Sequence, residues 1–441
     1  MTAAERVARN LAAALLAGAW TRRGLLKQTE TVLGRRTRRS QQALVRALLD
    51  GVTTDYPPSP DRLVALLLGS PAFRQAAGAQ IKNPRSVQPV LKYPKFAPAP
   101  RFAGLAVPRL ATPGDLAKWL ALSIDQLDWL SDARRQQGSM DTPILQHYRY
   151  AFVPKKTGAP RLIESPKPRL MAIQRRILHE ILDLVPTHDS VHGFVAGRSC
   201  LSAAQLHAGE SVVVAVDLKD FFLNTRLSRV HHIFRSLGYP WAVARVLTGL
   251  CSTSTPRSVF SRVPIAQRHD WLTQKIHQSP HLPQGAPTSP ALANLAAWQL
   301  DVRVRGLART YAANYTRYAD DLAFSGDRDF AGRIKPFLAG MEDIARSEGF
   351  VLNDRKTRIM RRAGCQRVTG VVVNEHINVP RAVFDALKAT LHNCRRNGPV
   401  AENRADLADF RAHLDGKVTW VEQVNPARAQ RLRRMFNEIR W

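Results

Sequence analysis

The sequence predicts an α+β protein with more than one folded unit. The chain has 441 residues, and a single hydrophobic core rarely serves so many. Apolar residues recur at helical spacing near both ends. The middle of the chain instead places short β-branched runs between helical segments. Hydrophobic residues make up 45% of the chain, which excludes a wholly disordered protein.

The charge balance predicts a polyanionic partner. The chain carries 65 Lys and Arg residues against 35 Asp and Glu residues, a net charge of +30. Most of the basic residues are arginines, whose planar guanidinium can form paired hydrogen bonds with phosphate. The alternative is a solvated basic surface, but an excess of this size favours nucleic acid.

Cysteine usage and hydropathy predict a cytoplasmic protein that does not bind a membrane. The four cysteines show no Cys-x-x-Cys spacing, so neither a zinc site nor a disulfide framework is expected. The apolar stretch at 7–20 contains Arg9 and is too short to span a bilayer, and we expect a helix there.

Residues 1–104 are predicted to form a basic helical N-terminal extension. Val7, Leu11 and Leu15 fall on one helix face. The densest basic cluster, Arg35 to Arg39, is either a nucleic-acid contact or a solvated helix face. Proline-rich stretches at 56–60 and 83–101 predict linkers, because proline interrupts helices and central strands alike.

Two short helices with strong start signals are expected next. Thr112 and Ser123 are good N-cap residues, with Asp115 and Gln126 three positions later. Two helices joined by a tight turn could be a helix-turn-helix DNA reader, but we favour packing against a larger domain.

Strands and then helices are expected over the rest of the chain. The predicted strands cover residues 211–216, 315–324 and 367–374. From Arg381 onward the pattern is helical, with an interruption expected at Asp415-Gly416 and another at Asn425-Pro426. One face of the first of these helices carries four apolar side chains: Phe384, Leu387, Leu391 and Cys394.

Three aspartates lie in predicted buried strands, where apolar residues are usually found. Asp217 ends the buried strand, and Asp320 and Asp321 are adjacent in an aromatic and apolar strand pair. A turn or cap is the usual explanation for two adjacent acids. Burying such charges without a partner is costly, however, and Mg²⁺ prefers hard oxygen ligands. Two such ions about 4 Å apart would clamp the attacking and leaving oxygens of a phosphoryl transfer.

These motifs resemble those of a known family. Tyr318 to Asp321 and the Asp217 strand resemble motifs C and A of reverse transcriptases, and residues 281–290 between them match the Pro-Gln-Gly motif. The resemblance covers about residues 105–441. Residues 192–199 and 368–374 further resemble bacterial retron reverse transcriptases. One departure is Leu223, where the family usually has proline.

The resemblance implies a right-hand polymerase fold, with fingers and palm over 105–375 and a helical thumb over 376–441. It implies that Asp217, Asp320 and Asp321 hold two Mg²⁺ ions, with Asp321 either ligating or orienting. Lys356 matches the motif D lysine, which protonates or neutralises the leaving pyrophosphate. The alternative for Lys356 is an ordinary surface lysine.

The same resemblance implies contacts to nucleotide and primer. The triphosphate, sugar and base of the incoming nucleotide would meet Lys156, Arg161, Phe222, Gln284 and Gly285. The primer grip would include Val368, Thr369 and Gly370. For Lys156 the alternative is a solvated turn, for Phe222 a core position, and for the primer-grip segment an ordinary core strand.

The implied activity is RNA-directed DNA synthesis by a retron enzyme. Such an enzyme copies its own structured noncoding RNA, from dNTPs, into a branched RNA-linked single-stranded DNA, and acts in antiphage defence with a separate effector protein. One alternative is a group II intron-like or other defence-associated reverse transcriptase. Intron enzymes usually add domains after the thumb, whereas this sequence ends at Trp441. Another is a catalytically idle nucleic-acid-binding module, against which the intact acids argue.

Overall fold

The computed structural model describes residues 2–17, 21–34, 38–51, 58, 60–83, 95–132, 135–155, 160–263 and 270–441. The chain divides into two compact units. Unit 1 comprises Met1–Pro186 with Phe222–Ala296, and unit 2 comprises Thr187–Phe221 with Ala297–Trp441. Both contain helices and strands, which confirms the α+β prediction. No helix among the described residues is long and apolar enough to cross a membrane.

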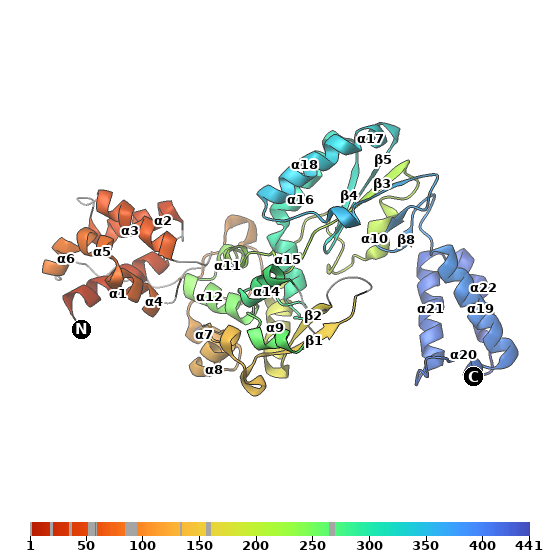
Figure 1. The fold of residues 1–441 in the computed structure, drawn as a ribbon, viewed down its shortest axis with the longest axis horizontal. Coiled ribbons are helices and arrows are strands. Elements are labelled where there is room, and N and C mark those ends of the chain that lie inside the picture. The colour runs from red at the N-terminus through yellow and green to blue at the C-terminus, as the bar shows by residue number, and fades with distance from the viewer. Residues whose placement is uncertain are drawn as a thin grey trace. The chain divides into compact units, whose positions relative to one another are not determined.

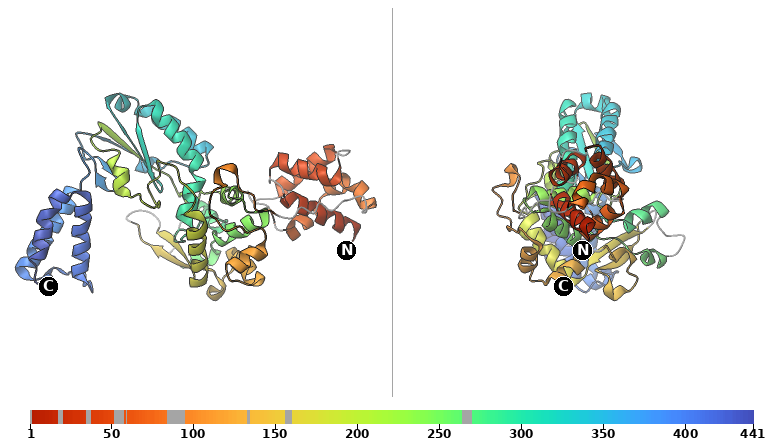
Figure 2. Two further views of the ribbon diagram at one scale, coloured as in Figure 1. Left: turned by 180° about the vertical axis from the view of Figure 1, so that it is seen from behind. Right: turned by 90° about the vertical axis from the view of Figure 1, so that its left-hand side faces the viewer.

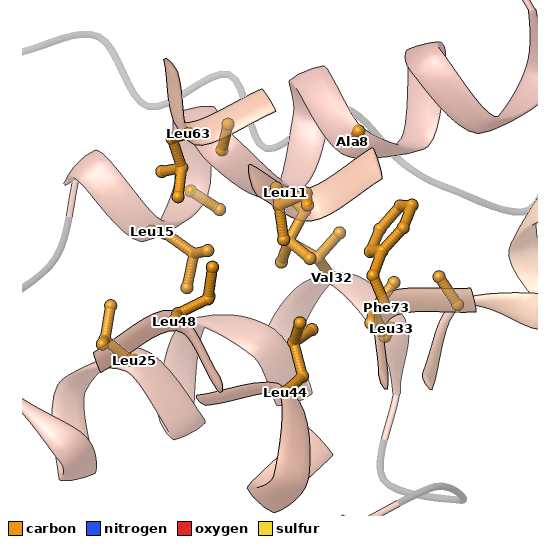
Figure 3. Packing of buried hydrophobic residues seen from close by; sticks show 14 of the residues in the cluster. Ala8, Leu11, Leu15, Leu25, Val32, Leu33, Leu44, Leu48, Leu63 and Phe73 are labelled. Atoms are coloured by element: carbon orange, nitrogen blue, oxygen red, sulfur yellow. The ribbon is translucent and has the colours of Figure 1, made fainter. Parts of the chain in front are cut away.

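The N-terminal part of unit 1 is helical (Figure 1). Val7, Leu11 and Leu15 are buried in one apolar cluster, so the predicted helix face is confirmed. Figure 3 shows Leu11 and Leu15 among the other apolar side chains of this cluster. Residues 35–37 of the basic cluster and 84–94 of the second proline-rich stretch lie outside the described residues. The helices are α1 (Ala3–Ala17), α2 (Arg22–Leu33), α3 (Arg38–Gly51), α4 (Pro60–Gly69), α5 (Pro71–Ala76) and α6 (Gly78–Lys82).

The rest of unit 1 surrounds a two-stranded hairpin, β1 (Tyr148–Val153) with β2 (Arg161–Pro166). Thr112 and Ser123 form the two predicted capping boxes, at the starts of α7 (Pro113–Trp119) and α8 (Ile124–Leu130). Both helices contact α12, as expected for packing against a larger domain. The remaining helices are α9 (Pro168–Ile177), α11 (Leu227–Ser236), α12 (Trp241–Leu250), α13 (Arg257–Ser261), α14 (Trp271–Gln278) and α15 (Ser289–Ala296).

Unit 2 is built on an antiparallel sheet with the strand order β4-β5-β3-β6. The central strand β3 (Val212–Asp217) is the predicted β-branched run. β4 (Asn314–Tyr318) and β5 (Asp321–Gly326) form the predicted strand pair, and β6 (Arg358–Arg361) lies at the other edge. The β3–β5 register pairs Asp217 with Asp321.

One face of this sheet is apolar and covered by helices. Phe324 of β5 stacks on Tyr315 of β4 with ring centroids 5.0 Å apart, and Phe337 of α18 meets Phe324 edge-on at 4.8 Å. The covering helices α16 (Trp298–Thr310) and α18 (Ile334–Ser347) lie side by side along the sheet, in front and rear views alike (Figures 1 and 2). The opposite face carries Asp217 and Asp321, because side chains alternate along a strand.

The C-terminal part of unit 2 is helical, with α19 (Arg381–Asn397), α20 (Pro399–Glu402), α21 (Phe410–Val424) and α22 (Pro426–Asn437). The four-residue apolar face predicted for α19 is buried. The interruption expected at Asn425-Pro426 is present, with Asn425 capping α22, but α21 continues through Asp415-Gly416. That predicted interruption is wrong, because buried Leu414 and Val418 hold the helix against its neighbours.

The predicted strand over 367–374 is also wrong as a continuous element. It is a short hairpin, β7 (Arg367–Val368) with β8 (Val371–Val372). Thr369 and Gly370 between the strands both have positive φ, at 50° and 85°. A two-residue loop with this backbone twist reverses the chain tightly. Finally, α10 (Cys200–Gln205) and α17 (Arg328–Gly332) complete the unit.

Candidate active site

Three carboxylates meet at one end of the unit 2 sheet. Asp217 is the last residue of β3 and is paired in register with Asp321, the first residue of β5. Asp320 precedes it in the two-residue turn from β4, and the Asp320 carbonyl accepts a hydrogen bond from the Leu218 N–H at 2.9 Å. The structure therefore brings together all three acids that the sequence singled out.

The local sequence explains why this end of the sheet is open. Ala215 and Ala323 lie next to Asp217 and Asp321 on the same face, and their small side chains leave space above the strands. The turn before Asp321 is tight, with Ala319 at φ 57°. A non-glycine residue pays for this left-handed conformation, which marks the turn as a constrained feature.

Electrostatics at this site favour a bound cation. Asp321 is an exposed residue, but its carboxyl group is partly desolvated; this, together with the negative charges of Asp320 and Asp217, raises its pKa from 3.8 to about 6. The Nζ of Lys356 donates to Oδ1 of Asp217 at 2.5 Å, and this hydrogen bond raises the pKa of Lys356. Lys356 is the predicted motif D lysine, and the structure places its ammonium among the carboxylates.

The donor set fits divalent metal ions. Carboxylates from three chain positions lie close enough for Asp320 and Asp217 to raise the pKa of Asp321, and a divalent cation would relieve this repulsion. Asp217 and Asp320 would hold the metal directly, and Asp321 would ligate or orient it. When bound, such ions stabilise negative charge on phosphate oxygens and lower the pKa of an attacking hydroxyl.

A pocket of about 560 Å³ extends from the carboxylates to the β7–β8 hairpin. Asp217, Asp321 and Lys356 line one part of it. The segment predicted as primer grip, Val368, Thr369 and Gly370, lines another. Val368 is buried, as an ordinary core position would be, whereas the turn after it faces the pocket.

The predicted nucleotide contacts belong to unit 1, apart from the carboxylates. Gln284 is half-buried, and its carbonyl accepts the backbone N–H of Glu164 at 2.8 Å. Gly285 has φ 133°, and a Cβ there would lie 3.1 Å from the Glu164 carbonyl oxygen. The glycine is thus needed for the close approach of its own backbone to β2. Arg161 begins β2 and is exposed, and Lys156 lies outside the described residues.

The two aromatic residues after Asp217 differ in burial. Phe221 is 3% exposed and packs on Phe350 with ring centroids 5.7 Å apart. Phe222 is half-buried. One of the pair is therefore a core residue, and Phe222 keeps the surface that a nucleotide contact requires.

A buried ion pair supports the Pro-Gln-Gly segment. Nε2 of His281 lies 2.8 Å from Oε2 of Glu164, and Nδ1 of His281 lies 2.7 Å from the Ser279 carbonyl oxygen. Burial disfavours the charged form of both side chains. The attraction between them is stronger than this effect, so the pKa of Glu164 is lowered and the pKa of His281 is raised. His277 brings a third possible metal ligand within 4.8 Å. We interpret the group as an ion pair, because hydrogen bonds already occupy both nitrogens of His281.

Sequence reasoning missed two groups that hold the site. The backbone N–H of Asn353 donates to the Asp217 carbonyl at 2.8 Å, and its side-chain amide lies 3.3 Å from Oδ2 of Asp217. Arg317, one residue before Tyr318, is fully buried against Asp301. A signal for Arg317 was present, since a charge inside an aromatic strand requires a partner.

Comparisons with known proteins agree with this geometry. Residues 153–379 match the model of the family described as "Reverse transcriptase (RNA-dependent DNA polymerase)". The chain is 38% identical over 340 residues to the retron Mx65 reverse transcriptase of Myxococcus xanthus, covering 76% of this chain and 73% of that protein. This chain is a bacterial retron reverse transcriptase.

Two further relatives support that placement. The retron Mx162 reverse transcriptase of M. xanthus is 36% identical over 340 residues, covering 74% of this chain and 66% of that protein. The retron Ec86 reverse transcriptase of Escherichia coli is 29% identical over 345 residues, covering 74% of this chain and 92% of that protein. The retron enzyme is an RNA-directed DNA polymerase with the palm, fingers and thumb fold of its family.

Proposed function

We propose that this retron enzyme copies its own structured noncoding RNA into a branched, RNA-linked single-stranded DNA. The observation that carries the polymerase chemistry is that Asp217, Asp320 and Asp321 lie at one end of the sheet, close enough to affect one another's charge. Two Mg²⁺ ions held there would supply the charge stabilisation of nucleotidyl transfer.

The protein's own residues would perform the remaining tasks. Lys356 holds a proton beside Asp217 that it can pass to the leaving pyrophosphate. Phe222 would face the sugar, Gln284 and Gly285 the base, and Lys156 with Arg161 the triphosphate. The hairpin turn at Thr369 and Gly370 would hold the primer strand along the pocket wall.

The biological setting follows from the same proposal. Residues 1–104 act as a basic helical extension that binds the noncoding RNA, and the net charge of +30 supports phosphate contacts. Defence against phage would need a separate effector protein, and the whole system would act in the cytoplasm.

Synthesis would start from a 2′-hydroxyl of a guanosine inside the folded RNA. Mg²⁺ can activate a 2′-oxygen as well as a 3′-oxygen, provided that it lies in line with the α-phosphate. The RNA's shape must then select the hydroxyl, through the helical C-terminal region and the arginine-rich surfaces.

The test is to express the protein with its neighbouring noncoding locus and to analyse the DNA that copurifies. We expect a short DNA whose 5′ end becomes accessible only after a debranching enzyme cuts a 2′–5′ link. The Asp320→Asn variant, expressed in the same way, is the control and should yield the RNA alone. A DNA with a free 5′ end would overturn the branched product while leaving the polymerase assignment intact.

A further inference from the structure

We propose that Arg317 and Asp301 are positioning residues that fix the turn carrying Asp320 and thereby set the metal affinity of the active site. Neither belongs to the motifs recognised in the sequence. The inference rests on the proposed role of Asp320 as a metal ligand. It concerns geometry beneath the sheet, on the face opposite the carboxylates.

The two residues form a forked ion pair in the core. Nη2 of Arg317 lies 2.6 Å from Oδ2 of Asp301, and Nε donates to Oδ1 at 2.7 Å. Both side chains are completely buried. Asp301 comes from α16, so the pair ties the covering helix to strand β4. The Tyr315 hydroxyl also donates to Oδ1 of Asp301 at 2.7 Å, which completes the surroundings of the carboxylate.

The third guanidinium nitrogen of Arg317 contacts the turn between β4 and β5, which is formed by Ala319 and Asp320. Nη1 of Arg317 donates to the carbonyl oxygen of Ala319 at 3.0 Å. Ala319 is the residue with φ 57°, immediately before Asp320. The hydrogen bond therefore restrains the one peptide whose orientation decides where Asp320 points. A flexible side chain could not do this, but a guanidinium fixed by a bidentate carboxylate can.

The turn is held from a second side by the segment that begins at Ser190. The Arg317 N–H donates to the Ser190 carbonyl at 2.7 Å, and the His192 N–H donates to the Arg317 carbonyl at 2.8 Å. At Gly193, a Cβ would lie only 2.7 Å from the Ala319 nitrogen. Backbone packing on one side and the guanidinium on the other therefore both restrain the turn.

Folding alone does not account for a charged pair here. A buried ion pair can often be replaced by apolar residues of similar volume without loss of stability, because desolvation offsets the attraction. Apolar residues could not donate to the Ala319 carbonyl, however. The pair is also electrically neutral as a whole, so we expect it to act through geometry rather than by adding charge to the metal site.

The decisive variant is the double substitution Arg317→Met with Asp301→Leu, which removes both charges together. We expect its thermal midpoint to stay within a few degrees of wild type. Its affinity for Mn²⁺, measured by electron paramagnetic resonance on the full chain without nucleic acid, should fall about 10–100-fold. Its kcat in primer extension should fall in parallel, while KM for dNTP changes little. Wild-type Mn²⁺ affinity in a stable double variant would overturn the proposal.

Two further variants keep the test decisive if the double variant does not fold. Arg317→Lys keeps the charge but loses the fork, so weaker Mn²⁺ binding is expected at near-normal stability. Tyr315→Phe is the matched control, since it removes one hydrogen bond to Asp301 without touching Ala319. If both variants lower stability and neither changes Mn²⁺ affinity, the network is merely structural. An Asp320→Asn variant that still binds Mn²⁺ and extends primers would instead refute the metal-ligand assignment itself.

Discussion

The two faces of the β4-β5-β3-β6 sheet use the same strands for opposite purposes. The covered face pairs large apolar side chains such as Phe324 with α16 and α18. The open face carries the small residues Ala215 and Ala323 next to the carboxylates of Asp217 and Asp321. Large aromatic side chains therefore pack on one side of the sheet, and the carboxylates lie on the other. Substitutions of the apolar side chains on the covered face should mainly reduce stability, and substitutions of the carboxylates should mainly reduce catalysis. The buried Arg317–Asp301 pair is the proposed exception on the covered face.

The largest effect is expected on the open face. Asp320→Asn should reduce RNA-templated primer extension by more than about 100-fold, because even residues behind metal ligands typically cost about 10–100-fold. The thermal midpoint should stay the same or rise, since one of three mutually repelling charges is removed. Extension assays with purified protein and thermal melts check both parts. Near-normal extension would show that Asp320 is not a metal ligand.

The covered face should respond in the opposite way. Phe324→Ala removes a fully buried ring between Tyr315 and Phe337, which should destabilise unit 2 by about 3–5 kcal/mol. The activity per folded molecule at low temperature should change little. Melting curves and active-site titration distinguish the two quantities. A variant that is stable but inactive would break the comparison between the faces.

An intermediate effect concerns pH and metal on the open face. Because the pKa of Asp321 is raised to about 6, its carboxyl group is increasingly protonated and neutral below that pH. Metal binding requires the ionised form, so the Mg²⁺ concentration for half-maximal activity should rise about tenfold per pH unit below 6. Titrations at several pH values measure this. In Asp321→Asn this dependence should disappear, and its persistence would implicate another group.

The smallest effect is expected at the two aromatic residues that follow Asp217 in the sequence. Phe222→Ala should increase ribonucleotide incorporation by about tenfold if, as proposed, its ring faces the sugar and excludes the 2′-hydroxyl. Phe221→Ala should instead lower stability, since Phe221 packs on Phe350. Competition between dNTP and rNTP in extension assays compares the variants. An unchanged sugar preference in both would remove Phe222 from the nucleotide site.

The sequence predicted the carboxylates of the open face, but not the buried contacts that hold them in position. Asp217, Asp320 and Asp321 could be found because acids are conspicuous in apolar strands. The helix starts at Thr112 and Ser123 followed from local capping chemistry. Arg317 and Asp301 could not be paired, because their contact depends on how α16 packs against β4. The interruption expected at Asp415-Gly416 failed for a related reason: local propensity gave way to tertiary packing.

The β3–β5 register has a consequence for insertions. Asp217 and Asp321 are direct partners across the sheet, although roughly a hundred residues separate them along the chain. The entropic cost of closing so long an excursion grows only with the logarithm of its length, so a foreign segment added within the excursion would cost little. A single residue added inside either strand would instead slip the pairing and rotate one carboxylate to the covered face. Length can therefore vary in the surface loops between these strands, but not within the strands.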